Sequence, residues 1–271
     1  MFTYLDPTVR RKLVADDKLI RIDASGQPLD VDAPPEPGSL SVNLLGPIPL
    51  PVTLDGWEGT FTWYAAVRNT ELSRVESLAE SLRAEGGQNL FSTMASSMAV
   101  NSVLMHGDPQ ASEMPVVRVH SNCHTGDVFG SQRCECGPQL HAAMQQIAAE
   151  PAGGMIIYMA GHEGRGIGLW AKAATYLLQD EGEDTYQANR SLGLPDDSRD
   201  FSEAAAMLLY FLGDKPFRLL TNNPKKVNDL RAAGLTRIVP EKHLTGVSQW
   251  NRHYLDAKRL KGHHIDTDDI E

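Results

Sequence analysis

The rhythm of apolar and polar residues along the chain predicts its order of strands and helices. Apolar residues that alternate with polar ones, or that gather in short β-branched and aromatic runs, favour strands, whereas apolar residues that recur every three or four positions favour helices. This alternation of element types predicts an α/β fold, a mixed α+β sheet with flanking helices. The predicted elements are a charged helix over 6–22, a strand over 57–64, a helix over 72–82, strands over 98–105 and 116–120, a helix over 139–148, a strand over 155–160, helices over 169–179 and 202–212, a strand over 217–220 and a helix from Pro224 to Gly234.

The strand predicted over 116–120 carries polar residues inside an apolar pattern. Successive side chains of a strand point to opposite faces. Arg118 and His120 therefore share one face, and Val117 and Val119 share the other. We expect the polar pair to point away from the core, just before the first cysteine of the chain.

Composition and charge narrow the class of protein. The chain has 271 residues, 41% of them hydrophobic and 22% charged, which allows one large domain or two smaller ones. Its 25 Lys and Arg against 35 Asp and Glu give a net charge of −10, which repels a nucleic acid unless basic residues gather in one pocket. The chain has no apolar run of about 18 residues, and its start lacks the apolar core of a secretory signal. We expect no nucleic-acid partner, no membrane contact and a cytoplasmic location.

All three cysteines, Cys123, Cys134 and Cys136, lie within one 14-residue window. An odd number cannot be fully paired in disulfides, and a cytoplasmic setting disfavours them. Three thiolates suit zinc, and water in the fourth position would make the site catalytic. His120 or His124 as the fourth ligand would instead close a structural site. The spacing leaves both possibilities open, together with that of buried free cysteines.

The segment His162–Gly168 directly follows a predicted buried strand and precedes a predicted helix. Its alternate glycines let backbone amides approach an anion at a helix N-terminus, and Arg165 adds a charge with bidentate geometry. The spacing fits neither a P-loop nor a complete dinucleotide motif. A glycine-rich turn with solvated charges is the alternative. Glu163 is accordingly either a carboxylate that binds a base edge or a charge at a helix start.

Two further polar clusters are weaker signals. The acidic loop 196–200 is of a kind that is usually solvated surface. The segment 221–226 ends a strand and starts a helix, with Pro224 after an Asn N-cap, and its two lysines suit a phosphate as well as a simple cap. His263 and His264 lie in a polar tail, where we predict no role for them.

Five segments, in this order and with these gaps, resemble the GTP cyclohydrolase II family: RVHSNCHTGDVFGSQRCECGPQL, EGRGIGL, LQDEGEDTYQAN, LGLPDDSRDF and LLTNNPKKV. The resemblance covers roughly 115–234, and a weaker similarity covers 50–64. It implies a zinc enzyme of riboflavin synthesis that hydrolyses GTP, opens the imidazole ring, and releases formate and pyrophosphate to give a diaminopyrimidinone ribosylamine phosphate. It also implies magnesium with the triphosphate, and a homodimer. The implied ligands of one zinc per chain are Cys123, Cys134 and Cys136.

The resemblance also implies roles at other positions. Tyr176 matches a tyrosine beside the ring chemistry. Arg199 matches an arginine assigned as nucleophile on the α-phosphate, assisted by Asp197. Because a protonated arginine is a poor nucleophile, a phosphate clamp is the conservative alternative for Arg199. The residues implied to hold the nucleotide are Arg118, Val119, His120, Ser121, Asn122, Gln139, Glu163, Gly164, Arg165, Thr185, Thr221 and Lys226.

Two residues depart from the family pattern. Asn122 stands where the family has an acidic residue, and His162 stands where it has glutamine. These changes leave open a paralogue that acts on another nucleotide or that stops at the formamide intermediate. A catalytically silent nucleotide-binding zinc protein is an alternative of a different class. Retention of Tyr176, Asp197, Arg199 and the three cysteines argues against the silent protein.

The chain is longer than the compact family core. We divide it into an N-terminal extension or arm over 1–47, a cyclohydrolase domain over 48–250 with an insertion at about 67–96, and a polar C-terminal tail over 251–271. Residues 23–39 are rich in Pro, Asp, Gly and Ser, which predicts a linker or a surface-hugging arm.

Overall fold

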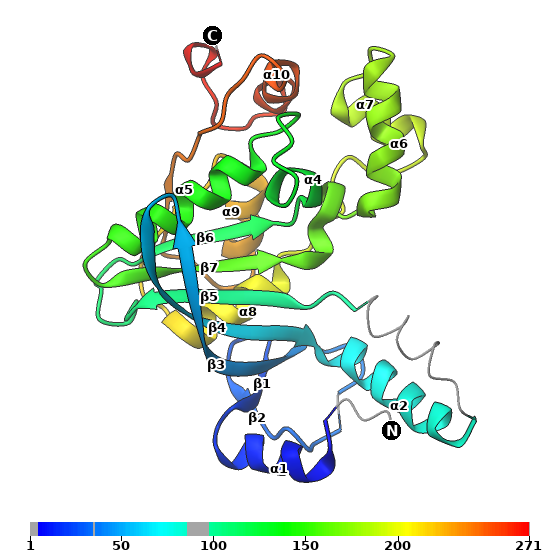
Figure 1. The fold of residues 1–271 in the computed structure, drawn as a ribbon, viewed down its shortest axis with the longest axis vertical. Helices are drawn as coiled ribbons and strands as arrows, with labels where there is room; N and C mark the ends of the chain where they lie inside the picture. Colours follow the sequence, from blue (N-terminus) through cyan, green and yellow to red (C-terminus); the bar gives the residue numbers. More distant parts are fainter. Residues whose placement is uncertain (1–4, 35, 86–97, 271) are drawn as a thin grey trace.

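The computed structural model describes residues 5–34, 36–85 and 98–270. Its centre is one mixed sheet in the strand order β2-β1-β3-β4-β5-β7-β6-β8-β9 (Figure 1). The strands are β1 Leu19–Asp23, β2 Pro28–Leu29, β3 Ser41–Leu54, β4 Trp57–Arg68, β5 Asn101–Gly107, β6 Val116–Ser121, β7 Gly153–Met159, β8 Phe217–Leu220 and β9 Ile238–Glu241. The fold is therefore the predicted mixed α/β arrangement.

Strand direction changes across the sheet. The pairs from β2 to β7 are antiparallel, whereas β7, β6, β8 and β9 run parallel to one another. Parallel strands bring their carboxyl ends, and the loops that follow them, to one edge of a sheet. Segments far apart in the sequence meet at this edge.

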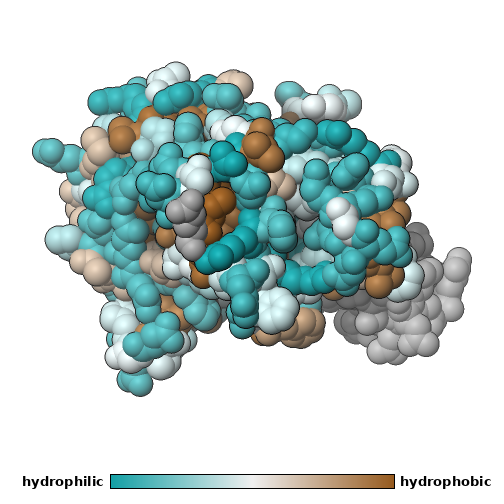
Figure 2. Space-filling model, turned by 90° about the horizontal axis from the view of Figure 1, so that it is seen from above, coloured by the Kyte–Doolittle hydropathy of each residue, from teal (hydrophilic) through white to brown (hydrophobic). Residues whose placement is uncertain are grey.

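The helices are distributed along the whole chain. They are α1 Pro7–Ala15, α2 Asn69–Glu85, α4 His124–Asp127, α5 Cys136–Ala149, α6 Gly168–Asp180, α7 Thr185–Ser191, α8 Ser202–Leu212, α9 Pro224–Ala232 and α10 Arg252–Leu260, with 3-10 turns at Ala160–Arg165 (η1) and Thr267–Asp269 (η2). None of the helices in the described ranges is long and apolar enough to cross a membrane. The surface seen from above is mainly hydrophilic, with separate apolar spots (Figure 2).

Two apolar clusters cover opposite faces of the sheet. Helices α8 and α9 pack on one face, over residues such as Val117, Val119 and Ile157. Helix α5 packs on the other face, over Val116 and Ile156. Strands β6 and β7 are thus covered on both faces, which fixes the edge at which their loops emerge.

Most of the predicted elements are confirmed. The strand predicted over 57–64 is the first part of β4, and the strand predicted over 217–220 is β8. The helix predicted over 72–82 lies within α2, and the later helices correspond to α5, α6, α8 and α9. These elements were predictable because their apolar residues recur with a clear local period.

The helix predicted over 6–22 is wrong in its second half. Helix α1 ends at Ala15, and the chain turns through Asp17, whose φ is 53°. Residues 19–23 then form β1, which pairs with β3 along five residue positions. Tertiary pairing with β3 outweighs the local helical pattern there.

Strand β3 was not predicted, because Pro47, Pro49 and Pro51 interrupt its apolar pattern. Strand β1 covers only residues 41–45 of β3. Beyond this point, within the described residues, β3 hydrogen-bonds on one side, to β4. A proline lacks an N–H donor and is tolerated where a strand has an open edge. The three prolines therefore fit an edge that only the folded structure reveals.

Two boundaries of the predicted domain division fall on described elements. Strand β3 runs across the division at residue 48, and α2 forms the first part of the predicted insertion. Residues 86–97 of that insertion lie outside the described residues. The division into an arm, a domain and a tail stays a prediction.

Candidate active site

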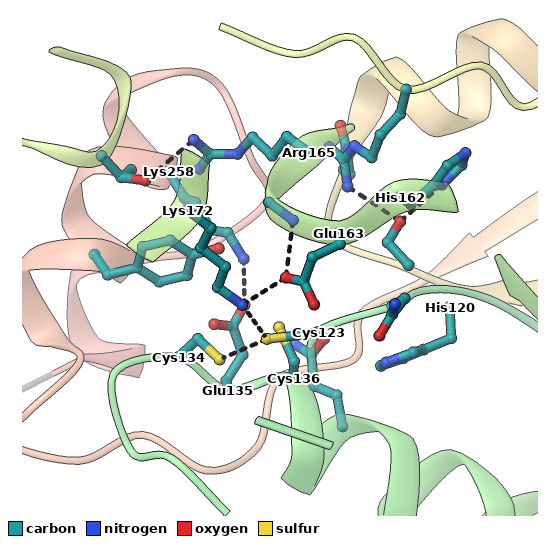
Figure 3. A pocket seen from close by; sticks show the side chains of 18 of the residues that line it. His120, Cys123, Cys134, Glu135, Cys136, His162, Glu163, Arg165, Lys172 and Lys258 are labelled. Atoms are coloured by element: carbon teal, nitrogen blue, oxygen red, sulfur yellow. Dashed lines mark hydrogen bonds and ion pairs between the residues drawn. The ribbon is translucent and has the colours of Figure 1, made fainter. Parts of the chain in front are cut away.

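Side chains predicted to act gather at the carboxyl edge of β6, β7 and β8, where they line one pocket (Figure 3). The loop after β6 carries Cys123, the turn η1 after β7 carries Glu163, and the loop after β8 carries Thr221. The parallel strands hold these loops side by side. The pocket thus follows from the strand directions of this half of the sheet.

The Sγ atoms of Cys123, Cys134 and Cys136 lie within 4.8 Å of one another. The Sγ atoms of Cys123 and Cys134 are 3.5 Å apart, and zinc–sulfur bonds of about 2.3 Å in a tetrahedron place sulfurs about 3.8 Å apart. A Cβ at Gly126 would lie 3.0 Å from the Cys134 Sγ, so a residue without a side chain is suited to this position. The three donors fit a zinc ion.

Neither histidine considered as a fourth ligand joins this cluster. Among the described residues, the group of close ligand atoms consists of the three sulfurs. His120 Nε2 lies 3.1 Å from Asp127 Oδ2, and the ring of His124 packs against Phe129 with centroids 4.8 Å apart. The geometry favours a three-thiolate site with a free fourth position over a closed structural site.

Lys172, buried on α6, connects the sulfur cluster with Glu163. Its Nζ is 3.1 Å from the Cys123 Sγ and 2.7 Å from Glu163 Oε1. Hydrogen bonds from Cys134 and Cys136, together with the charge of Lys172, lower the pKa of the Cys123 thiol. The thiolate is the form that binds metal, so Cys123 is suited to be a ligand, whereas hydrogen bonding with Cys123 raises the pKa of Cys134 and of Cys136.

Both carboxylate oxygens of Glu163 accept hydrogen bonds from the protein. Oε1 accepts from Lys172 Nζ and from the backbone N–H of Gly164, at 2.7 and 2.9 Å. Oε2 accepts from the backbone N–H of His124 at 2.6 Å. Each carboxylate oxygen has about two lone-pair sites, so Oε2 retains capacity for one more donor. Glu163 is buried and hydrogen-bonded, so it is not a solvated charge at a helix start.

Asp127 on α4 joins several groups behind the cysteines. It accepts from the Tyr158 hydroxyl and from the backbone N–H of Cys123, both at 3.0 Å, and lies beside His120 Nε2. Burial lowers the pKa of His120, so its neutral ring donates from Nε2 to the carboxylate. His120 Nδ1, which has no partner among the described residues, is then a hydrogen-bond acceptor.

Arg118 and Gln139 connect β6 with α5. Arg118 donates to the backbone oxygen of Leu220 and to Gln139 Oε1, both at 2.7 Å. Gln139 Nε2 donates to the backbone oxygen of His243 at 3.0 Å. Burial lowers the pKa of Arg118 to about 10, which still leaves it charged at neutral pH.

The glycine-rich segment adopts left-handed backbone conformations that glycine accepts readily. The φ angles of Gly164, Arg165 and Gly166 are 58°, 64° and 90°. Arg165 Nη1 donates to Thr185 Oγ1 at 3.2 Å, and its guanidinium lies 4.1 Å from the ring centroid of Tyr186. The turn therefore directs Arg165 into the pocket and holds it there, which the alternative of solvated charges does not explain.

Arg199 forms a bidentate ion pair with Asp197. Its Nε and Nη2 lie 2.9 and 2.6 Å from the two carboxylate oxygens, and Nη1 donates to Ser121 Oγ at 3.3 Å. Burial opposes the charge of Arg199, but Asp197 outweighs this and raises the pKa of the guanidinium. The Arg199 side chain, 12% exposed, is a fixed positive charge at the pocket wall.

Helix α9 begins as predicted and delivers a lysine to the pocket. Asn223 Oδ1 accepts from the backbone N–H of Lys225 at 3.0 Å, and Lys226 Nζ donates to the backbone oxygen of Val119 at 2.5 Å. Burial and the neighbouring arginines lower the pKa of Lys226 well below its usual value. An anion in the pocket would favour the charged form of this lysine.

Tyr176 on α6 lies beside the sulfur cluster. Its hydroxyl is 3.2 Å from Thr125 Oγ1, and the Arg133 guanidinium lies 4.6 Å from its ring centroid. Burial raises the pKa of Tyr176. The phenol is thus protonated at neutral pH and is available as a donor.

The two departures from the family pattern are built into the wall of the pocket. Asn122 accepts from the Tyr158 hydroxyl at 2.9 Å and donates to a backbone oxygen at 3.1 Å. His162 Nδ1 lies 3.2 Å from Ser121 Oγ, and its Nε2 lies 2.9 Å from the backbone oxygen of Asp200. Burial lowers the pKa of His162 to about 4. The side-chain polar atoms of both residues are therefore hydrogen-bonded to other protein atoms.

The structure brings nearly all predicted site residues to this pocket. Those that line it are Arg118, His120, Ser121, Asn122, Cys123, Cys134, Cys136, Gln139, Glu163, Gly164, Arg165, Tyr176, Thr185, Arg199, Thr221 and Lys226. Val119 and Asp197 are not among the lining residues. The Val119 side chain lies in the apolar core, so any nucleotide contact is confined to its backbone, and Asp197 reaches the pocket only through Arg199.

Several residues without a role predicted from the sequence also line the pocket, namely Arg133, Glu135, Lys172, Tyr254, Lys258 and His263. One signal for Lys172 was present: it is the single charged residue in the predicted helix over 169–179. Glu135 lies between two cysteines. The tail residues carry no local signal, because their proximity to the pocket depends on the path of the chain after β9.

The pocket is rich in positive charge although the whole chain is acidic. The charged residues that line it are Arg118, Arg133, Arg165, Lys172, Arg199, Lys226 and Lys258, against Glu135 and Glu163. A local concentration of cations of this kind suits a ligand with several negative charges. The negative net charge of the chain is thus compatible with one basic pocket.

Comparison with known proteins gives a family match that contains the pocket residues from Arg118 to Lys226. The family model described as GTP cyclohydrolase II matches residues 88–241. The chain is 48% identical over 158 residues to GTP cyclohydrolase-2 of Helicobacter pylori, which covers 58% of this chain and 79% of that protein. It is 53% identical over 156 residues to the riboflavin biosynthesis protein RibBA of Mycobacteroides abscessus. This match covers 57% of this chain and 37% of that protein.

Plant proteins match over the same region. The chain is 47% identical over 163 residues to a probable bifunctional riboflavin biosynthesis protein, RIBA 1, chloroplastic, of Oryza sativa, with 60% of this chain and 30% of that protein covered. In five RIBA and RibBA relatives, the match spans 27% to 41% of the relative's length. The similarity thus concerns one part of these longer proteins.

Proposed function

Since the chain belongs to the GTP cyclohydrolase II family, we propose that it hydrolyses GTP at the start of riboflavin synthesis. The proposed reaction opens the imidazole ring, releases formate and pyrophosphate, and gives a diaminopyrimidinone ribosylamine phosphate. One observation carries the proposal: the three-sulfur cluster and the Arg199 guanidinium line the same pocket. The base and the phosphates of one nucleotide then have separate partners within reach.

The proposed metal is one zinc ion per chain, held by Cys123, Cys134 and Cys136. The close approach of their sulfur atoms supports this assignment. When bound, zinc supplies a Lewis acid that activates water at neutral pH, which is what opening an aromatic ring requires. Magnesium accompanies the triphosphate as part of the substrate.

The residues around the sulfur cluster orient the base. In this proposal the remaining lone pair of Glu163 Oε2 accepts from the guanine edge that carries the N1 and N2 donors, and adenine offers no such donor pair. Lys172 holds the carboxylate in position and balances its buried charge, since Nζ and Oε1 are 2.7 Å apart. Tyr176 donates from its protonated hydroxyl beside the ring.

Other residues of the same pocket bind the phosphates in this proposal. Arg199 keeps its charge because Asp197 raises its pKa, so we propose that it first acts as a clamp on the α-phosphate. A nucleophilic role requires Asp197 to accept a proton from the guanidinium. Lys226 and Arg165 add further cationic contacts to the phosphates.

Incubation with each of the four nucleoside triphosphates tests the proposed function. We expect GTP to be consumed preferentially, with formate as a product. Preferential consumption of another triphosphate would support the paralogue instead. GTP consumption without formate would support an enzyme that stops at the formamide intermediate. Binding without consumption would support the silent protein.

Replacement of Glu163 by glutamine is expected to weaken the preference for GTP over ATP. An unpaired buried polar group costs on the order of 1 to 3 kcal/mol, which corresponds to roughly tenfold to hundredfold discrimination. The measurement is the ratio of kcat/KM for GTP and ATP. Glu181→Gln, at an exposed position after α6, is the control. An unchanged ratio in Glu163→Gln would show that another residue reads the base.

The proposed assembly is a homodimer. Helix α6 presents apolar residues to solvent along one side, with Trp170 91% and Leu177 68% exposed, and an exposed stripe of this kind suits contact with a second copy of the chain. Sedimentation equilibrium is expected to give twice the chain mass, and Trp170→Glu with Leu177→Glu to give monomers. A wild-type monomer at micromolar concentration would contradict this assembly. The cytoplasmic location stays a prediction.

A further inference from the structure

The predicted polar tail returns to the pocket. After β9 the chain forms α10 and places Tyr254, Lys258, His263 and Ile265 among the lining residues. Figure 1 shows α10 above the carboxyl edge of β6. This segment lies beyond the family match, which ends at residue 241. The tail therefore forms a wall of the pocket that sequence analysis did not expect.

The segment is anchored by specific contacts. The backbone N–H of His264 donates to the backbone oxygen of Asn222 at 2.8 Å, next to the pocket residue Thr221. Asn251, fully buried, accepts from the backbone N–H of Ser248 at 2.9 Å. Leu255 is also fully buried. These contacts fix the position of α10 relative to the pocket.

Lys258 is held in the pocket wall by an ion pair. Its Nζ lies 2.5 Å from Glu135 Oε1, and the two side chains are 14% and 3% exposed. The ammonium also lies 4.5 Å from the ring centroid of Tyr254. A lysine has three N–H donors, and Glu135 uses one of them. The others are available to a ligand in the pocket.

Three buried polar atoms nearby have no hydrogen-bond partner among the described residues. They are Nη2 of Arg165, Nδ1 of His263 and Oε2 of Glu135. The Arg165 guanidinium lies between two rings, 4.1 Å from the centroid of Tyr186 and 5.7 Å from that of Tyr254. Buried polar groups are nearly always paired. Unpaired groups of this kind in a pocket wall indicate that a ligand or water completes their hydrogen bonds.

The charged groups that act most strongly on His263 are positive. Burial, with the charges of Lys258, Arg165 and Arg199, lowers the pKa of His263 to about 3. These cations therefore converge on a neutral imidazole. Oxygen atoms of a phosphate chain can accept from every one of these groups, whereas a neutral base cannot balance their charge.

We propose that Lys258 and His263 bind the polyphosphate of the nucleotide substrate, so that the C-terminal segment completes the phosphate site. This inference rests on the proposed function, because it assumes a nucleoside triphosphate in the pocket. Lys258 keeps Glu135 as one partner and donates to a phosphate oxygen. Tyr254 positions Arg165 for the same phosphates.

A purely structural role for Lys258 is the competing explanation. Glu135 lies between two of the clustered cysteines, and removal of Lys258 alone leaves its buried carboxylate without a counter-charge. Replacement of both residues, Glu135→Gln with Lys258→Met, removes the whole ion pair. The double variant therefore separates binding from charge balance, and it serves if the single variant does not fold.

The test measures binding of magnesium pyrophosphate and of guanosine to the zinc-loaded protein by calorimetry. We expect Lys258→Met, alone and together with Glu135→Gln, to weaken pyrophosphate binding roughly tenfold to hundredfold, as for loss of a charged hydrogen bond. Guanosine affinity and zinc content should stay unchanged. His263→Phe should weaken pyrophosphate binding severalfold. Arg259→Met is the matched control, since Arg259 lies on the same helix and pairs with Asp256.

The outcomes separate this inference from the proposed function. Wild-type protein that binds neither ligand overturns the proposed function and this inference with it. Wild-type protein that binds both, with unchanged pyrophosphate affinity in Lys258→Met, overturns the inference alone. Recovery of wild-type pyrophosphate affinity in the double variant also overturns it, because Lys258 would then act only through Glu135.

Discussion

Protein carrying Cys134→Ser is expected to lose its zinc and its formate release while it still releases pyrophosphate. A hydroxyl is a much poorer zinc ligand than a thiolate, and the Cys134 Sγ is one of only three clustered ligand atoms among the described residues. Loss of zinc affinity should exceed the roughly 10- to 100-fold that loss of an outer-shell partner costs. The Arg199–Asp197 pair lies outside the sulfur cluster, so the phosphate stage should continue.

The measurement is zinc content by elemental analysis, with formate and pyrophosphate assayed separately. Wild-type protein stripped by a chelator is the control, because it should show the same split between products and recover formate release when zinc returns. The variant should not recover. Equal loss of both products in folded, zinc-free protein would refute this division of labour.

Replacement of Arg199 by methionine is expected to reduce pyrophosphate release by about a thousandfold or more, which is the scale seen when an arginine that stabilises phosphoryl transfer is lost. The guanidinium is buried in a bidentate pair and lines the pocket. Arg190→Met is the matched control, since Arg190 forms an equivalent pair with Asp196 at the surface and does not line the pocket. Equal effects of the two substitutions would contradict the assignment.

Arg199→Lys distinguishes the two roles of this residue. A clamp acts through positive charge, which lysine retains without the bidentate geometry. Partial pyrophosphate release in Arg199→Lys therefore supports the clamp. Release as low as in Arg199→Met supports a nucleophile, because the attacking nitrogen of the guanidinium is then required.

Local patterns predicted the parts of the fold and site that depend on neighbours in sequence. Alternation in β6 placed Arg118 and His120 on the face that lines the pocket, while Val117 and Val119 face the core. The N-cap of α9 likewise needs only the residues beside it. The resemblance then supplied the set of distant residues that meet in the pocket.

Features that depend on long-range packing were beyond such patterns. Lys172 lies 49 residues from its partner Cys123, and Lys258 lies 123 residues from Glu135. Neither pairing leaves a periodic signal. The tail has a polar sequence because Lys258 and His263 line a charged pocket rather than an apolar core. This placement depends on where the chain returns to the sheet.

The most direct test of the account is a product count from zinc-loaded wild-type protein incubated with GTP and magnesium. Formate, pyrophosphate and remaining GTP are measured together over time. We expect one formate and one pyrophosphate for each GTP consumed. Persistence of GTP with neither product, in folded protein that carries one zinc per chain, would contradict it.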